Sequence, residues 1–218
     1  MSTRDLLRDN DIRFQQIAAT LTVDEWAAPS LCAAWTNHAV LAHLVIGYGT
    51  GPGVVVAEMR RKRGSFDNAN AEISRHLAER RSPTELLHDF AGLIHRPAGM
   101  GRYFPRALLL GDHVTHELDI LFAIDREPTT SPDALTAVLN TQVSLPNPFV
   151  PAFRNSRGLR IKATDVAWAH GRRGPEVYGR AADLVSALGN RPRALDRLQG
   201  AGVAVLAARL SRPTRTAG

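Results

Sequence analysis

Three polar residues at helical spacing interrupt the most apolar stretch of this chain, residues 105–124. Asp112, His116 and Asp119 are separated by four and three positions, which places them one above another on one face of a helix. Their neighbours are mostly Leu, Ile, Val and Phe, so this helix is predicted to be buried almost all round. Buried carboxylates and imidazoles are costly unless they are paired or bind a metal. The stripe therefore predicts a polar partner or a metal ion.

His43 is the candidate partner, because it also lies within an apolar helical segment. Asp112 and His116 stand one turn apart, a rise of about 5.4 Å, and side chains at this spacing can converge on one ion. With His43 they would form a three-ligand site for a divalent metal, with one position open for water or a substrate thiolate. Asp119 is placed to orient His116 from outside the ligand set.

The same residues permit simpler interpretations. Asp112 and His116 could form an ordinary helix pair, and His43 could be a satisfied core histidine. His113 and Glu117 fall on another face of the helix and are predicted to form a solvated pair. The remaining histidines are predicted to lie at the surface or in loops: His38, His76, His88, His95 and His170.

The composition predicts a soluble cytoplasmic protein. Among 218 residues, 44% are hydrophobic, which is enough for a sizeable core, but no apolar run reaches the length of a membrane span. The N-terminus is charged and has no apolar signal segment. Cys32 is the single cysteine, which excludes an internal disulfide and fits a reducing compartment. It could be a nucleophile, but nothing nearby activates it, so a packed thiol is favoured.

The net charge of +6 does not by itself predict a nucleic-acid partner. All basic residues except Lys62 and Lys162 are arginines, and they are scattered without a motif that reads DNA or RNA. The expected partners are small molecules, with the chain acting as a monomer or homodimer.

The fold class is predicted to be α+β. Residues 1–145 read as helices, including a capping box in which Ser82 is followed by Pro83 and by Glu85. Residues 146–158 contain three prolines and are predicted to form a linker. Residues 159–218 begin with an alternating, strand-like pattern and are predicted to form a small α/β domain.

Three blocks of this sequence resemble the mycothiol-dependent maleylpyruvate isomerase family. They are SLCAAWTNHAVLAHL near the N-terminus, GDHVTHELDI in the middle helix, and the C-terminal run from LRIKATDVAW to GPEVYGRAADLVSALGNRPRALDRLQG. The blocks cover nearly the whole chain and occur in the order expected for the family. Asp112 stands where the isomerase has Glu, and His38 stands where an Arg or another polar residue is usual.

The resemblance implies a DinB-like four-helix bundle, a divalent metal such as zinc, and mycothiol as a thiol cofactor. Carried over residue by residue, it makes His43, Asp112 and His116 the metal ligands. Arginines of the C-terminal region would help to bind the thiol or substrate, and Arg180 and Arg191 are the candidates here. The implied activity is S-transfer to a small electrophile or its isomerisation; the alternatives are a non-catalytic protein that binds a metal or small ligand, and a structural protein with a buried hydrogen-bond network.

Overall fold

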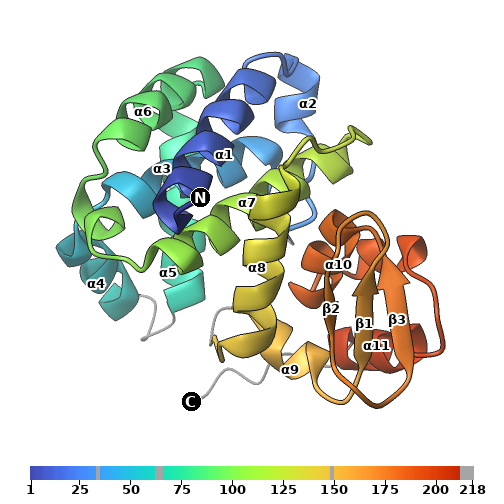
Figure 1. The fold of residues 1–218 in the computed structure, drawn as a ribbon. Coiled ribbons are helices and arrows are strands. Elements are labelled where there is room, and N and C mark those ends of the chain that lie inside the picture. The colour runs from blue at the N-terminus through green and yellow to red at the C-terminus, as the bar shows by residue number, and fades with distance from the viewer. Residues whose placement is uncertain (33–34, 62–65, 148–149, 212–218) are drawn as a thin grey trace. The chain divides into compact units, whose positions relative to one another are not determined.

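The computed structural model describes residues 1–32, 35–61, 66–147 and 150–211. Within it the chain forms two compact units, residues 1–129 and 130–218. The first unit is helical, and the second contains a small sheet with helices (Figure 1). The predicted α+β class is therefore confirmed.

The first unit contains helices of very different length. The long ones supply the core, while the short ones connect them or close the ends. In chain order they are α1 Thr3–Ala18, α2 Val23–Ala27, α3 Asn37–Gly49, α4 Pro52–Arg61, α5 Phe66–Arg80, α6 Pro83–His95, the 3₁₀ helix η1 Gly99–Arg102, and α7 Arg106–Ala123.

Four of these helices form a closed bundle. Helix α1 packs against α6 and α7, and α3 packs against the same two helices from the other side. Helix α5 covers a further face of α3 and contacts α4. Capping boxes at Ser2, Thr22 and Ser82 start α1, α2 and α6, the last as predicted.

The bundle core is apolar and contains one aromatic cluster. Phe14 of α1 meets Phe90 of α6 edge to face, with ring centroids 6.0 Å apart, and Tyr48 of α3 lies 5.8 Å from the same ring. All three side chains are almost fully buried. Their burial fixes α3, which is apolar on nearly every face, at the centre of the unit. This packing sets the positions of the polar side chains that α3 and α7 carry.

His38 at the start of α3 is half-buried rather than a surface residue, because α6 is preceded by a turn that reaches it. Its Nε2 lies 3.0 Å from the carbonyl oxygen of Arg81, to which a neutral imidazole donates. Burial lowers the pKa of His38, and the hydrogen bond to Arg81 offsets only part of that effect.

The lowered pKa of His38 predicts a pH dependence of stability. The unfolded chain takes up this proton more readily than the folded protein, so the free energy of unfolding should fall as pH drops below about 6.5. His38→Gln should reduce this fall, because glutamine does not titrate. Urea unfolding at pH 7.5, 6.5 and 5.5 measures the effect, with exposed His88→Gln as the matched control. Equal slopes in wild type and His38→Gln would contradict the assignment.

The second unit has a three-stranded sheet in the order β2–β1–β3. Strand β1 pairs antiparallel with β2 and parallel with β3. Ile161 and Ala163 point into the core while Arg160 and Lys162 face outward, which confirms the predicted alternation. The elements are α8 Pro132–Ser144, α9 Ala152–Ser156, β1 Arg160–Ala163, β2 Ala169–His170, β3 Glu176–Gly179, α10 Ala181–Leu188, the 3₁₀ helix η2 Pro192–Arg197, and α11 Val203–Leu210.

The compact units divide after residue 129, whereas the sequence places the end of the first domain at residue 145. The difference is α8, which packs on α9 and α10. Gln142 of α8 donates to the Val185 carbonyl oxygen at 3.3 Å, and Trp168 donates to Asn140 of α8 at 2.8 Å. These contacts join α8 to the second unit. The predicted domain end at 145 and linker at 146–158 thus differ from the division between the two compact units.

No helix in the described part of the chain combines the length and apolar character needed to cross a bilayer.

Candidate metal centre

The structure brings His43, Asp112 and His116 together. Helix α3 carries His43, and α7, which packs against it, carries the other two. Asp112 lies between the histidines: its Oδ2 is 3.4 Å from Nε2 of His43, and its Oδ1 is 3.6 Å from Nε2 of His116. The two imidazole rings meet edge to face with centroids 4.7 Å apart. We refer to these three residues as the histidine–aspartate cluster.

The spacing of this cluster suits a small divalent ion. Donor atoms about 2.0–2.1 Å from a tetrahedral zinc stand about 3.3 Å from one another. One ligand atom from each of the three residues lies within 4.8 Å of the others. Nε2 of His43 is buried and makes no hydrogen bond with the described residues, although the Asp112 carboxylate lies 3.4 Å away. A buried polar atom that makes no hydrogen bond is costly, and a metal ion would satisfy it.

The electrostatics favour the protonation states that bind metal. Burial opposes ionisation of Asp112, but the adjacent His43 and His116 lower its pKa well below the usual range. Burial lowers the pKa of His116 despite the nearby Asp112 and Asp119 carboxylates. An ionised carboxylate and a neutral imidazole are the donor forms that a divalent metal needs. The Asp112 side chain is 36% exposed, so the cluster has an accessible side.

Each histidine is held by its other ring nitrogen. Nδ1 of His116 lies 3.0 Å from Oδ2 of Asp119, whose side chain is fully buried. Nδ1 of His43 lies 3.2 Å from Oδ1 of Asn70, on α5. Both contacts direct Nε2 toward Asp112. Asp119 therefore lies where the predicted orienting role requires it. Asn70 was not predicted, because it is distant in sequence from His43 and nothing in its own segment pointed to the cluster.

Asn70→Ala should weaken metal binding without unfolding the protein. Losing the hydrogen bond to Nδ1 frees the His43 ring to rotate, and such outer contacts contribute about 10–100-fold to metal affinity. Zinc titration against a competing chelator measures this loss. Asn68→Ala, an exposed position two residues earlier on α5, is the control and should bind zinc as wild type does. Equal affinities in the two variants would exclude an orienting role for Asn70.

Two further side chains from the segment before α3 adjoin the cluster. The Trp35 ring lies 5.0 Å from the His43 ring and is stacked 5.8 Å from the His116 ring, centroid to centroid. Cys32 offers a sulfur within 4.8 Å of donor atoms of His116 and Asp119. The segment is tied to α7 by the Leu31 amide, which donates to the Asp119 carbonyl oxygen at 3.2 Å. Trp35 belongs to a block whose resemblance was noted, but its position over both rings was not predicted.

Comparisons with known proteins identify what the helical unit and the whole fold are similar to. Residues 7–107 match the family model for the mycothiol maleylpyruvate isomerase N-terminal domain. Residues 7–107, a little under half of this chain, are therefore similar to that domain. The match includes His43 and ends before Asp112 and His116, so the α7 residues are supported by their geometry here and by the sequence resemblance. The comparison by sequence with curated proteins gives no match.

Two solved structures share the fold of this isomerase family. One is the crystal structure of the mycothiol-dependent maleylpyruvate isomerase, which is 14% identical, has a TM-score of 0.55, and matches over 91% of each chain. The other is a histidine-to-alanine mutant of that enzyme, with 13% identity, a TM-score of 0.55 and the same 91% coverage of both chains. These likenesses confirm the predicted DinB-like helical bundle followed by a small α/β region.

His113 and Glu117 do not form the predicted solvated pair. Both are buried, because α1 packs on this face of α7 and places an ionisable side chain of opposite charge type beside each of them. Nδ1 of His113 lies 2.9 Å from Oδ1 of Asp11, and Arg13 donates to Glu117 at 2.5 Å. Tyr48 donates its hydroxyl proton to the other oxygen of Asp11. The helical bundle thus contains a second buried polar network beside the cluster.

The two C-terminal arginines lie in the second unit. Arg180 caps the start of α10, and its Nε is 3.8 Å from Oδ2 of Asp165. Arg191 precedes η2, and its guanidinium donates to the Gly189 carbonyl oxygen. Their binding of thiol or substrate stays a prediction.

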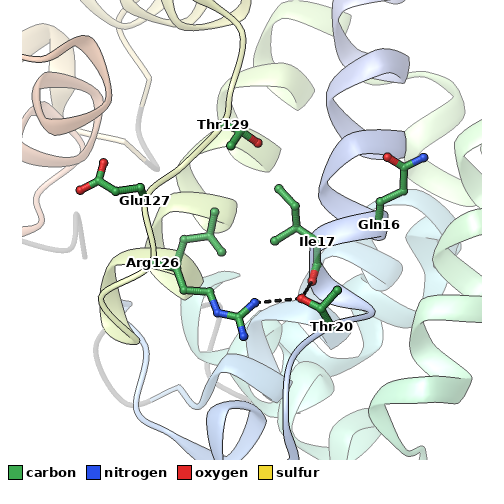
Figure 2. Close-up of a pocket in the computed structure, with 7 residues that line it drawn as sticks. Gln16, Ile17, Thr20, Arg126, Glu127 and Thr129 are labelled. Atoms are coloured by element: carbon green, nitrogen blue, oxygen red, sulfur yellow. Dashed lines mark hydrogen bonds between the residues drawn. The ribbon is translucent and has the colours of Figure 1, made fainter.

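A cavity of about 460 Å³ opens at the ends of α1 and α7, away from the cluster residues. Figure 2 shows Arg126 reaching toward Thr20 across this cavity, with the Thr20 hydroxyl donating to the Ile17 carbonyl oxygen. Arg126 also pairs with Glu25 at 2.9 Å. Its charge is already matched within the fold, so the cavity is not a charged recognition site.

Proposed function

We propose that this chain is a metal-dependent enzyme that uses mycothiol on a small electrophilic substrate, with S-transfer or isomerisation as the outcome. One observation carries the proposal: His43, Asp112 and His116 converge on one point in a bundle of the isomerase family, and the buried Nε2 of His43 has no other described partner. The low-molecular-weight thiol and the small substrate follow from the family. A reducing cytoplasm suits such a thiol and the single Cys32.

The residues present fit a divalent ion, which we propose to be zinc. His43, Asp112 and His116 would hold it, since two imidazoles and a carboxylate are a common zinc donor set. When bound, such an ion supplies Lewis acidity that favours thiolate over thiol at its open position.

The protein's own side chains prepare this site. Asp119 and Asn70 accept or share the Nδ1 protons of the two histidines, which keeps both Nε2 atoms available as donors. Trp35 covers both imidazole rings and limits the access of water to them. The exposed edge of Asp112 leaves an approach for thiol and substrate. A thiolate approaching there would add to one carbon of an activated C=C bond; after rotation about the resulting single bond, breaking of the C–S bond would restore the double bond and release the thiolate, which completes an isomerisation.

Thiol consumption tests this proposal directly. Purified protein should contain about one divalent ion per chain. With mycothiol and maleylpyruvate or simple electrophiles, the loaded protein should accelerate turnover, and chelation should abolish it until zinc is restored. Metal binding without thiol-dependent turnover would favour the second candidate, a non-catalytic binding protein of the same fold. Absence of stoichiometric metal would leave the cluster as a buried hydrogen-bond network and reject both the metal-dependent enzyme and a metal-binding protein.

A further inference from the structure

A second cavity, of about 280 Å³, lies in the bundle where α1, α6 and α7 meet. Four basic side chains line it: Arg4 and Arg8 of α1, His95 of α6 and Arg106 of α7. Among the described residues that line it there is no carboxylate. We call this cavity the cationic pocket. Three guanidinium groups around one small volume repel one another unless an anion occupies it.

The arginines of this pocket are partly fixed by the fold. Arg106 is half-buried and donates from Nη1 to the Gly101 carbonyl oxygen at 3.0 Å, which leaves its other donors available. Arg8 is held by Asp9 at 2.9 Å and Asp5 at 3.7 Å. The side chain of Arg4 makes no hydrogen bond or ion pair with any described residue. Its charge is therefore not compensated within this part of the protein.

The remaining walls of the pocket are apolar. Leu7, Ile94 and the ring of Tyr48 are buried around it, and Pro97 adds a further apolar surface. Sites that combine a few charged groups with an apolar lining select small molecules that have an anionic head and an apolar body. At about 280 Å³, its volume lies just below the usual range for ligand sites, about 300–1,000 Å³, so the ligand must be small.

The cationic pocket is separate from the histidine–aspartate cluster. Tyr48 follows His43 by five positions on α3, and Arg106 precedes Asp112 by six positions on α7. At about 100° per residue these offsets turn the side chains about 140° and about 120° around their helices. The pocket therefore opens from other faces of the same two helices.

We propose that the cationic pocket is a binding site for a small organic anion, a carboxylate or phosphate joined to an apolar group. The guanidinium groups of Arg4 and Arg106 hydrogen-bond the anionic oxygens, and Arg8 adds charge from the rim. The apolar group lies against Leu7, Ile94 and Tyr48. This inference does not depend on the metal-dependent activity.

Calorimetric titration with three probes tests the proposal on the full chain. Benzoate and phenyl phosphate carry the same ring with different anionic heads, and benzamide is the neutral counterpart of benzoate. We expect saturable 1:1 binding of at least one anion, at least about tenfold tighter than benzamide. The anion that binds more tightly identifies the head group. Equal binding of benzamide, or no saturable binding of either anion, overturns the proposal.

Charge-matched variants locate the site. Arg4→Gln and Arg106→Gln should each weaken binding about tenfold, whereas Arg96→Gln should not. Arg96 is exposed between His95 and Pro97 but does not line the pocket, so its replacement removes the same charge nearby. Arg4 is also exposed, so its variant tests the site even if Arg106→Gln alters folding. Equal losses in Arg4→Gln and Arg96→Gln would show nonspecific attraction and overturn the proposal.

The same titration separates this site from the metal centre. Binding should persist in protein treated with chelator and in the His116→Ala variant, because neither change touches the pocket. Loss of anion binding together with the metal would overturn the proposal of a separate site. Failure of thiol turnover would leave anion binding unchanged.

Discussion

Replacing His116 with alanine should remove the metal from this protein and abolish its thiol-dependent turnover. In the proposed site His116 supplies one of three protein donors, and its Nε2 lies 3.6 Å from Oδ1 of Asp112 on the same helix. Two remaining donors hold a divalent ion weakly, so we expect at least about a 100-fold loss in zinc affinity. Elemental analysis of dialysed protein and thiol-consumption assays measure the two effects.

The control for this experiment is His88→Ala. His88 lies exposed on α6, so its loss removes a histidine without touching the histidine–aspartate cluster. This variant should retain metal and activity, and helical circular dichroism should match in both variants. Full metal retention in His116→Ala would reject His116 as a ligand. Metal loss in both variants would point to weak surface binding instead.

Replacing Asp11 with alanine should have the largest effect on stability. Asp11 is fully buried and accepts from Tyr48 and from Nδ1 of His113. Burial opposes a charged His113, but the Asp11 carboxylate raises the pKa of that imidazole, and burial beside Asp11 raises the pKa of the Tyr48 hydroxyl. Without the carboxylate, two buried donors have no acceptor. We expect a loss of about 3–5 kcal/mol in the free energy of unfolding.

Urea denaturation of the Asp11→Ala variant measures this loss. Asp9→Ala removes a carboxylate from the same helix, but Asp9 is 49% exposed and its ion pair among the described residues is with Arg8, so the control should lose about 1 kcal/mol or less. Adding Tyr48→Phe to Asp11→Ala should cost less than Tyr48→Phe alone, since the acceptor is already absent. A loss in Asp11→Ala no greater than in Asp9→Ala would contradict a buried network.

The sequence indicated the cluster because burying polar side chains is costly, and such side chains are rare within apolar runs. An Asp or His inside a run of Leu, Ile and Val is improbable unless the fold compensates it, so Asp112, His116 and His43 stand out against their neighbours. Helical periodicity then placed two of them on one face. Nothing local shows that α3 lies against α7. His43 was proposed as the partner because it is also a polar residue in an apolar helix, and the family resemblance implied the same three residues.

The errors have a common cause, which is that local patterns do not identify the neighbouring element. His113 and Glu117 read as a solvated pair, yet α1 covers them with Asp11 and Arg13. The prolines after α8 read as a domain boundary, yet the amide side chains of α8 bond within the second unit. Asn70 and Trp35 carry no helical or metal-ligand signal, although both contact the cluster histidines.

The sequence by itself determined which side chains are too polar for their surroundings, where helices begin, and that the fold class is α+β. Only the tertiary structure decided what compensates each of those side chains. The apolar pattern of a helix indicates which of its faces will be buried, whereas hydrogen bonds and ion pairs require two specific atoms within about 3 Å, which only the packing of distant segments provides.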